Sequence, residues 1–305
     1  MYDTIIIGSG PAGITASIYA ARRAMKALLL GKNVGGQVTW ATEIENYPGF
    51  TNISSFDLIQ KWQDHVTAAG VDMKHEDVFR IEKKDDYFLI AASNGEKKEY
   101  LTKTLIITMG LSHRLLNVPG ETEFTGKGIS YCANCDGPFF KNKIVAVIGG
   151  GNCALDAAEV MGKMASRVYL ISRDDKLNGF ENVIAKIKNN NKIEIIYNSN
   201  VKEILGDNKV TSLNIINHKN IEERELTVDG VFVEIGREAR TDLVQNLVKV
   251  DNQNQIIIDC EGKTSTPGIF AAGDVTNVPF KQISIAVGQG TIAALSAYKY
   301  LQLKK

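Results

Sequence analysis

The chain has 305 residues, of which 35 are basic and 35 are acidic, and 44% of it is hydrophobic. This balance of charge argues against a surface built for nucleic acid or for an anionic membrane, and no apolar run is long enough to cross a bilayer. The first residues lead straight into an apolar, strand-like segment without a basic leader, so we expect a cytoplasmic protein. The length favours two domains.

The N-terminal segment predicts a nucleotide-binding unit. A strand over residues 4–7 is followed by a glycine-rich turn, an alanine-rich helix and a second strand over residues 27–30. The turn carries Gly8, Gly10 and Gly13 at the spacing with which such turns accept the pyrophosphate of a dinucleotide. The first glycine permits the tight turn, the second lets backbone amides approach the phosphates, and the third lets the helix pack on the strand.

The same pattern returns 141 residues later without a gap. Gly149, Gly151 and Ala154 stand where the first copy has its three glycines, again with a strand before them and a helix after them. A long ungapped repeat is better explained by two such units than by coincidence. The sequence therefore predicts an α/β fold with two Rossmann-like nucleotide-binding units.

Both copies lack the acidic residue that usually binds an adenosine ribose, because Gly31 and Ser172 occupy its two places. After Ser172 the chain continues with Arg173, Asp174, Asp175 and Lys176, in which the charges cancel. The aspartates would repel the 2′-phosphate of NADPH, so this segment favours NADH, or use of both cofactors, over strict use of NADPH. The alternative is a solvated loop with no specific role.

Two cysteines between the copies form a Cys-x-x-Cys pair, Cys132 and Cys135, followed by Asp136. Zinc would need two further ligands, but Cys153 and Cys260 stand alone and the four histidines are scattered, so we expect no metal site. A structural disulfide across so short a loop would stabilise little. The spacing favours a redox-active pair that exchanges with another disulfide. Cys153 is expected to be a small packing residue and Cys260 an incidental one.

Near its end the chain carries a short apolar strand, residues 268–272, that leads into Gly273 and Asp274. A helix with apolar residues at helical spacing begins near Gln282. Asp274 suits a carboxylate that accepts hydrogen bonds from a sugar-like chain, and the positive helix N-terminus would favour negative charge on a reduced ring.

Taken in order, six segments resemble the low-molecular-weight thioredoxin reductases across essentially the whole chain: GSGPAG (8–13), GGQ (35–37), ENYPG (45–49), CANCDG (132–137), VAVIGGGN (145–152) and GIFAAGD (268–274). The stretches around the cysteine pair and after Asp274 are also similar to the flavoprotein component of bacterial alkyl hydroperoxide reductase. The resemblance implies an FAD-binding domain made of residues 1–113 and 243–305. An NAD(P)H-binding domain with the redox pair, residues 114–242, would be inserted between them.

The same resemblance implies roles for individual residues. Cys132 would meet the incoming disulfide, Cys135 would face the flavin, and Asp136 would be the general acid, unless it is only a turn residue. The implied FAD contacts are Gly8, Ser9, Gly10, Pro11, Ala12, Gly13, Gly36, Gln37, Asn46, Gly273, Asp274, Lys281, Gln282 and Ile283. The implied NAD(P)H contacts are Gly149, Gly151, Asn152, Ala154 and Arg173. Asn46 and Asp274 also suit purely structural roles.

The function implied is that of a flavoprotein disulfide oxidoreductase. It would pass electrons from NADPH or NADH through FAD and the cysteine pair to thioredoxin, or to a thioredoxin-like or glutaredoxin-like protein, and it would be a homodimer. A domain rotation about residues 108–114 and 234–242 is part of this expectation. One alternative is the same core fed by ferredoxin or serving a peroxiredoxin system. An alternative of another class is a non-enzymatic, dinucleotide-binding redox sensor.

Overall fold

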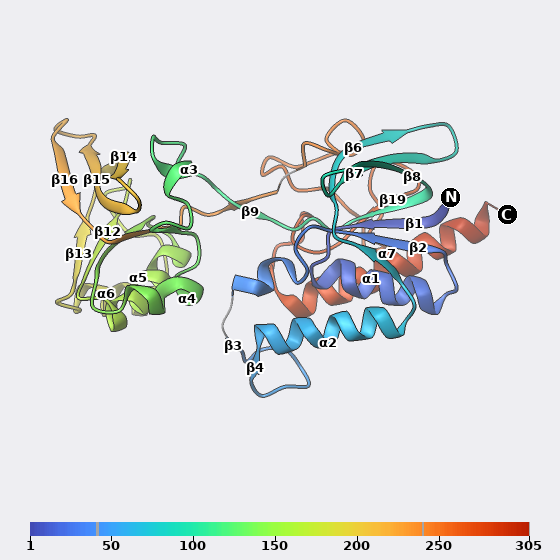
Figure 1. The fold of residues 1–305 in the computed structure, drawn as a ribbon, viewed down its shortest axis with the longest axis horizontal. Coiled ribbons are helices and arrows are strands. Elements are labelled where there is room, and N and C mark those ends of the chain that lie inside the picture. The colour runs from blue at the N-terminus through green and yellow to red at the C-terminus, as the bar shows by residue number, and fades with distance from the viewer. Residues whose placement is uncertain (41–42, 240, 305) are drawn as a thin grey trace. The chain divides into compact units, whose positions relative to one another are not determined.

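The computed structural model describes residues 1–40, 43–239 and 241–304. The chain divides into two compact units, one made of residues 1–112 with 238–305 and the other of residues 113–237 (Figure 1). The two crossings between them are β9 (Ser112–His113) and β18 (Arg237–Glu238), which pair as a short two-stranded sheet. The assignment of the units to FAD and to a nicotinamide cofactor stays a prediction.

The first unit is built on a seven-stranded sheet with the order β5-β2-β1-β8-β7-β6, in which β19 also pairs with β8. The strands around β1 and β19 are parallel, whereas β6 and β7 are antiparallel to their neighbours. The strands are β1 (Tyr2–Ile7), β2 (Ala27–Leu30), β5 (Asp72–Lys74), β6 (Asp77–Lys83), β7 (Phe88–Ser93), β8 (Lys97–Ile107) and β19 (Ile269–Ala271).

Three helices cover one face of this sheet: α1 (Pro11–Arg22), α2 (Ser55–Ala68) and α7 (Ile283–Leu303) (Figure 1). They share a core with Ile6, Leu29, Ile106 and Phe270. The alternate strand residues face a second core, which the loop segment carrying Val244, Val248 and Ile256 closes. The short elements of this unit are η1 (Gly36–Trp40), β3 (Glu43–Ile44) and β4 (Ile53–Ser54).

The second unit has three layers around a five-stranded parallel sheet of order β10-β17-β11-β12-β13. Its strands are β10 (Ile129–Ser130), β11 (Ile144–Ile148), β12 (Arg167–Ile171), β13 (Ile193–Ile196) and β17 (Gly230–Val233). Helices α5 (Asn152–Met164) and α6 (Glu181–Lys188) pack on one face. An antiparallel sheet of β14 (Ser199–Gly206), β15 (Val210–Asn217) and β16 (Glu223–Thr227) packs on the other. The short helices are α3 (Glu121–Phe124), α4 (Ala133–Asp136) and η2 (Gly137–Phe140).

The two predicted copies fold alike. Ile7 pairs with Leu30 at the end of β1 and β2, and Ile148 pairs with Ile171 at the end of β11 and β12. The strands β2 and β11 read as unbroken apolar runs because parallel strands in the middle of a sheet are covered on both faces. The prediction of an α/β fold with two Rossmann-like units is confirmed. Among the described residues, no helix is both long and apolar enough to span a bilayer.

Helix α7 packs against α1 at a glycine. A Cβ atom at Gly290 would lie 2.2 Å from the carbonyl oxygen of Ala12, so only glycine lets the two helices approach this closely. Gly288 lies on the exposed side of the same helix, with no atom within 4 Å of its ideal Cβ.

We expect Gly290→Ala to lower the stability of the protein by about 1–3 kcal/mol, because the overpacked contact outweighs the gain in helix propensity. The matched control, Gly288→Ala, should be neutral or stabilising by up to about 1 kcal/mol. Thermal and denaturant unfolding of the two variants measure the difference. Equal stability of both variants would contradict the close packing of α1 on α7.

Candidate active site

The glycine turn of the first unit is shaped by contacts that exclude larger side chains. A Cβ at Gly13 would lie 1.8 Å from the carbonyl oxygen of Gly8 and 2.7 Å from Oγ1 of Thr108. Oγ1 of Thr108 in turn donates to the carbonyl oxygen of Gly8, at 2.8 Å. Above Gly10, in contrast, the nearest heavy atom is Cα of Gly36, 4.0 Å from an ideal Cβ. The turn is therefore tight where helix meets strand and open at the helix N-terminus, where a phosphate would approach.

Residues from both ends of the chain meet at this turn within the first unit. Nε2 of Gln37 donates to Oδ2 of Asp274 at 3.1 Å, and Nδ2 of Asn46 donates to Oε1 of Gln282 at 3.2 Å. The backbone N–H of Gly35 donates to the carbonyl oxygen of Ser9 at 2.8 Å. The structure thus pairs Gln37 with Asp274 and Asn46 with Gln282, while their contact with FAD stays a prediction.

Lys281 and Ile283 belong to the same segment but face other groups. Nζ of Lys281 donates to the carbonyl oxygen of Thr276 at 2.6 Å and to Oε1 of Gln255 at 2.9 Å, which ties the loop before α7 together. Burial lowers the pKa of this ammonium group, and the nearby carboxylate of Asp274 opposes that shift. Ile283 begins α7 and packs against the core of the first unit.

The two positions that lack the usual acidic residue, Gly31 and Ser172, each lie in close contact with the glycine-rich turn of their own unit. A Cβ at Gly31 would lie 2.4 Å from Oγ of Ser9, and a Cβ at Gly150 would lie 2.6 Å from Oγ of Ser172. Ser9 is the counterpart of Gly150, and Gly31 is the counterpart of Ser172. Each unit therefore has room for one small side chain at this point, and the two units place it on opposite partners. The repeat in the sequence aligns Ser9 with Gly150 and Gly31 with Ser172. The contact between the two positions within each unit is visible only in the structure.

The turn of the second unit follows β11 in the same way. A Cβ at Gly149 would lie 2.4 Å from the carbonyl oxygen of Glu234 and 2.8 Å from Cβ of Ala154. Oδ1 of Asn152, the first residue of α5, accepts a hydrogen bond from the backbone N–H of Phe180 at 3.0 Å. The turn lies between β17 and β12, at the point where the strand order reverses, which is where ligands bind in open parallel sheets.

The charged side chains after β12 already form ion pairs and hydrogen bonds with neighbouring protein groups. The side chain of Arg173 is 77% exposed, and its Nε lies 3.6 Å from Oδ1 of Asp174. Oδ2 of Asp174 also accepts from Nδ2 of Asn178 at 3.3 Å, and Oδ2 of Asp175 lies 3.5 Å from Nζ of Lys219. The guanidinium expected to meet a nucleotide therefore has a carboxylate beside it.

The predicted redox pair begins a short helix at the end of β10. Cys132 is disulfide-bonded. The side chain of Cys135 lies outside the described residues, so the predicted pairing stays a prediction. Oγ of Ser130 accepts from the N–H of Cys132 at 3.0 Å and donates to its carbonyl oxygen at 3.2 Å. The N–H of Asp136 donates to the carbonyl oxygen of Cys132 at 3.1 Å, which closes the first turn of α4.

A charged cluster that the sequence analysis missed lies beside α4. Glu234 follows β17 directly, and its carboxylate accepts a hydrogen bond from the backbone of Ala133. Burial raises the pKa of Glu234 to about 7, whereas Arg237 opposes the shift and Asp156 adds to it. The only sequence signal for this residue is one acidic side chain inside the apolar stretch GVFVEIG.

Cys153 corrects one expectation, since it is exposed and free rather than a packing residue. A small side chain in the first turn of α5 suggested packing, but the turn carries it on the surface of the helix. Partial burial of its thiol still raises the pKa of Cys153, and Glu234 and Asp156 act in the same direction.

His113 lies at the start of the second unit, stacked on Tyr131 with ring centroids 5.0 Å apart. Burial lowers the pKa of His113 to about 4, and Arg237 adds to the shift. This imidazole is therefore neutral at neutral pH and is no source of protons there.

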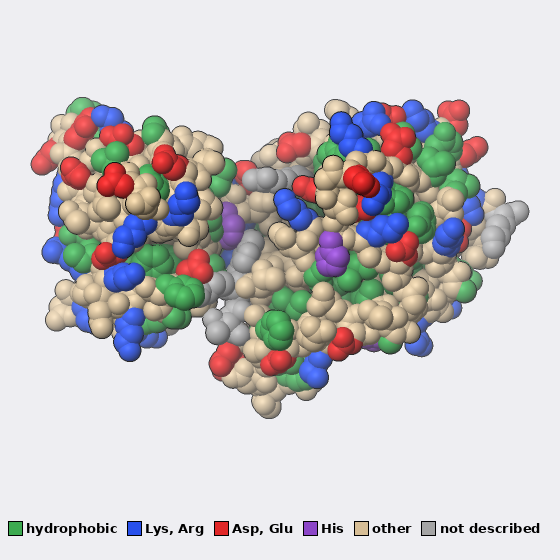
Figure 2. Space-filling view, in the orientation of Figure 1, with side chains coloured by type: hydrophobic (Ala, Val, Ile, Leu, Met, Phe, Trp, Pro, Cys, Tyr) green, Lys and Arg blue, Asp and Glu red, His purple; other side chains and the backbone are tan. Residues whose placement is uncertain are grey.

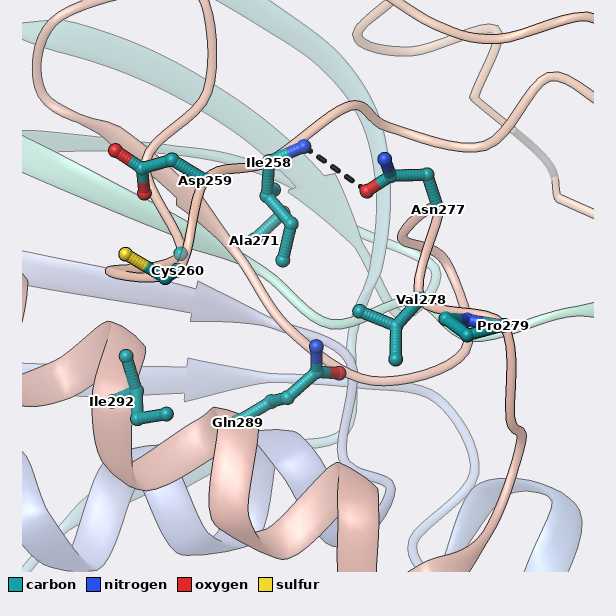
Figure 3. A pocket seen from close by; sticks show the side chains of 10 residues that line it. Ile258, Asp259, Cys260, Ala271, Asn277, Val278, Pro279, Gln289 and Ile292 are labelled. Atoms are coloured by element: carbon teal, nitrogen blue, oxygen red, sulfur yellow. Dashed lines mark hydrogen bonds between the residues drawn. The ribbon is translucent and has the colours of Figure 1, made fainter.

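A pocket of about 310 Å³ lies elsewhere in the first unit (Figure 3). Cys260, the other free cysteine, faces it from a loop, and Gln289 and Ile292 face it from α7. None of the lining residues is a predicted site residue. Within the described part of the chain, no group of three histidine, cysteine or acidic side chains could hold a metal ion. Figure 2 shows acidic and basic side chains interspersed over the visible face.

Comparisons with known proteins agree with this geometry. The family model for pyridine nucleotide-disulphide oxidoreductases matches residues 2–290. A thioredoxin reductase of Treponema pallidum is 39% identical over 302 residues, which are 98% of this chain and 97% of that protein. An alkyl hydroperoxide reductase component of Pseudomonas putida is 37% identical, over 98% of this chain but 58% of that protein.

Among solved structures, the thioredoxin reductase of Lactococcus lactis in its FR conformation superposes with a TM-score of 0.86. It is 40% identical, and the match covers 99% of this chain and 100% of that one. Sequence, topology and the position of the cysteine pair thus lead to the same assignment. The chain belongs to the pyridine nucleotide-disulphide oxidoreductase family and, within it, to the low-molecular-weight thioredoxin reductases.

Proposed function

We propose that this protein is an FAD-dependent thioredoxin-disulfide reductase. Electrons would pass from NADH or NADPH, through FAD and the pair Cys132–Cys135, to a thioredoxin or a thioredoxin-like or glutaredoxin-like protein. The observation that carries the proposal is the disulfide-bonded Cys132 at the start of α4, in a chain with two dinucleotide turns. The unit of residues 1–112 and 238–305 would bind FAD, and residues 113–237 would bind the nicotinamide cofactor.

The first unit fits FAD. Helix α1 starts from Gly10 with no acidic side chain in its first turn, so its N-terminus suits a pyrophosphate. Asp274 and Gln37 offer a carboxylate and an amide beside that turn, suited to the hydroxyls of a ribityl chain. FAD, when bound, supplies the two-electron chemistry that links a hydride donor to a disulfide.

The second unit fits a nicotinamide dinucleotide in the same terms. Helix α5 also has no acidic residue in its first turn, and its N-terminus lies at the reversal of strand order. The carboxylates of Asp174 and Asp175 disfavour a 2′-phosphate, so NADH or both cofactors would serve as donor. Reduction by neither cofactor would favour a ferredoxin-fed protein of the same core.

The outgoing step would be thiol–disulfide exchange. The thiolate of Cys132 attacks one sulfur of the partner's disulfide and forms a mixed disulfide, while the partner's other sulfur leaves as a thiolate. The Cys135 thiolate then attacks Cys132, which reforms the Cys132–Cys135 disulfide and releases the partner with two more electrons. Asp136, half-buried beside the pair, would give its proton to a leaving thiolate.

A surface suited to docking the partner lies in η2, directly after α4. Phe139 is 74% exposed in η2, and large exposed aromatic side chains are typical anchors of protein interfaces. Because the partner's disulfide must reach Cys132, an apolar anchor three residues after α4 is well placed for docking. A homodimer is a further part of the proposal, to be tested by sedimentation.

We expect Cys132→Ser to reduce thioredoxin turnover by at least about a thousandfold, because the attacking sulfur is lost. Reduction of bound flavin by NADH or NADPH should persist. Cys260→Ser changes a free, exposed cysteine and should leave turnover unchanged. The measurement is anaerobic: flavin bleaching by each donor, and then electron uptake per flavin, which should fall by two in the serine variant. Unchanged uptake would argue against a redox-active pair.

Asp174→Asn should raise kcat/KM for NADPH about three- to tenfold, because it removes a negative charge and frees Arg173 for a phosphate. The value for NADH should change little. Asp175→Asn, whose carboxylate lies beside Lys219, is the matched control and should have the smaller effect. Stopped-flow reduction with both donors tests this, and an equal gain for NADH would refute the assignment.

Phe139→Ala should raise KM for thioredoxin about tenfold and leave flavin reduction unchanged, because it removes a docking contact and no reacting group. Phe56→Ala is matched to it, since Phe56 is also 74% exposed but lies in the first unit. Steady-state kinetics with varied thioredoxin provide the measurement. A similar rise for both variants would mean that neither phenylalanine marks a specific docking site.

A further inference from the structure

Glu234 has no part in the chemistry assigned above, yet it lies beside the redox segment. Strands β10 and β17 are parallel neighbours, and Ser130 pairs with Phe232. Cys132 follows the end of β10 by two residues and Glu234 directly follows β17, so both lie just beyond the same end of these neighbouring parallel strands.

The carboxylate of Glu234 also contacts the redox segment. It accepts a hydrogen bond from the backbone of Ala133, whose N–H belongs to the peptide group that directly follows Cys132. Normal hydrogen-bond and covalent geometry then puts the carboxylate within roughly 7 Å of the Cys132 side chain. At that range a full charge on Glu234 changes the energy of a charge on the cysteine sulfur.

Charged groups on β18 and on α5 act on this carboxylate. Arg237 of β18 favours its charged form, and Asp156 of α5 disfavours it. Cys153, also on α5, lies close enough for Glu234 to raise the pKa of its thiol. Because burial dominates and brings the pKa of Glu234 to about 7, this carboxyl changes charge near neutral pH, where an ordinary glutamate stays ionised.

We propose that Glu234 is a positioning residue for the redox pair, which holds the first turn of α4 through the Ala133 N–H and sets how readily the reduced Cys132 thiol gives up its proton. The inference rests on the proposed function only in that Cys132 must become a thiolate to attack a partner. The step is an acid–base one: the thiol loses a proton to solvent, and no electrons move.

The direction of the effect follows from charge. Ionised Glu234 repels a thiolate and occupies the backbone N–H that could otherwise stabilise it, so it raises the pKa of Cys132. Protonated Glu234 no longer repels the thiolate, although its carbonyl oxygen can still accept from the Ala133 N–H. As pH rises through about 7, Glu234 becomes charged, and the thiolate of Cys132 therefore accumulates more slowly than it would for an isolated thiol.

The test is titration of Cys132 by alkylation with iodoacetamide in a Cys135→Ser background, which leaves one thiol at the site and needs neither cofactor turnover nor a partner. Tandem mass spectrometry of the peptide that carries Cys132 separates it from Cys153 and Cys260. We expect Glu234→Gln to lower the pKa of Cys132 by about one unit and to speed its alkylation at pH 7.5 by several-fold, up to about tenfold. Below pH 6 the two proteins should react alike.

Glu225→Gln provides the control, since it removes the same charge from an exposed site on β16 of the same unit. It should change the rate by less than about twofold. The protein with Glu234 intact gives a readout that needs no substitution there, because its alkylation rate between pH 6 and 8 should follow a broader curve than one thiol with a single pKa gives. The inference would be overturned if Cys132 titrated with a single pKa while Glu234 is present. It would also be overturned if Glu234→Gln and Glu225→Gln shifted the pKa of Cys132 equally.

Thioredoxin turnover separates the two claims. If the pKa of Cys132 moves but thioredoxin is not reduced, the proposed function fails and the inference stands. If thioredoxin is reduced but the pKa does not move, the inference alone fails. Glu234→Ala, which removes the acceptor as well as the charge, should slow turnover several-fold more than Glu234→Gln. Equal turnover of these two variants would contradict the positioning role.

Discussion

The approach of each helix to the strand before it is the constraint on which both candidate sites depend. In the first unit a single added carbon at Gly13 would meet the carbonyl oxygen of Gly8 at 1.8 Å, and in the second Gly149 leaves the same kind of room for Ala154. Only small residues let the helix N-terminus stand directly over the end of the strand. Because backbone N–H groups at that N-terminus are unpaired within the helix, the same packing that builds the core creates an anion site.

The two copies then diverge within this shared constraint. One small side chain fits between the turn and the end of the second strand, as Ser9 in the first unit and as Ser172 in the second. The first unit excludes any side chain at residue 31, which is where a ribose-binding acid would stand. The second unit places its carboxylates later, at Asp174 and Asp175, where each already faces a cation. The missing acid of the first unit thus has a local steric cause, whereas the acids of the second unit stand two and three residues beyond Ser172.

The redox segment depends on the second sheet in another way. Because β10 lies next to β17 and runs parallel to it, the chain leaves both strands at the same end of the sheet, toward Cys132 and toward Glu234. Glu234 therefore combines three properties. It is half-buried, it is bonded to the backbone of the redox helix, and its pKa is near neutrality. Asp136 and Glu234 would then be two carboxyl groups with different environments beside one pair of sulfurs.

The sequence by itself determined the two repeated units, the Cys-x-x-Cys pair and the family, because glycine spacing, apolar runs and short motifs are properties of neighbouring residues. Only the tertiary structure decided which distant side chains meet. Gln37 lies 237 residues from Asp274, and Asn46 lies 236 from Gln282, yet each pair is hydrogen-bonded. The exposure of Cys153 and the neutral-range pKa of Glu234 likewise depend on strand register and burial, which arise only when segments far apart in the chain pack together.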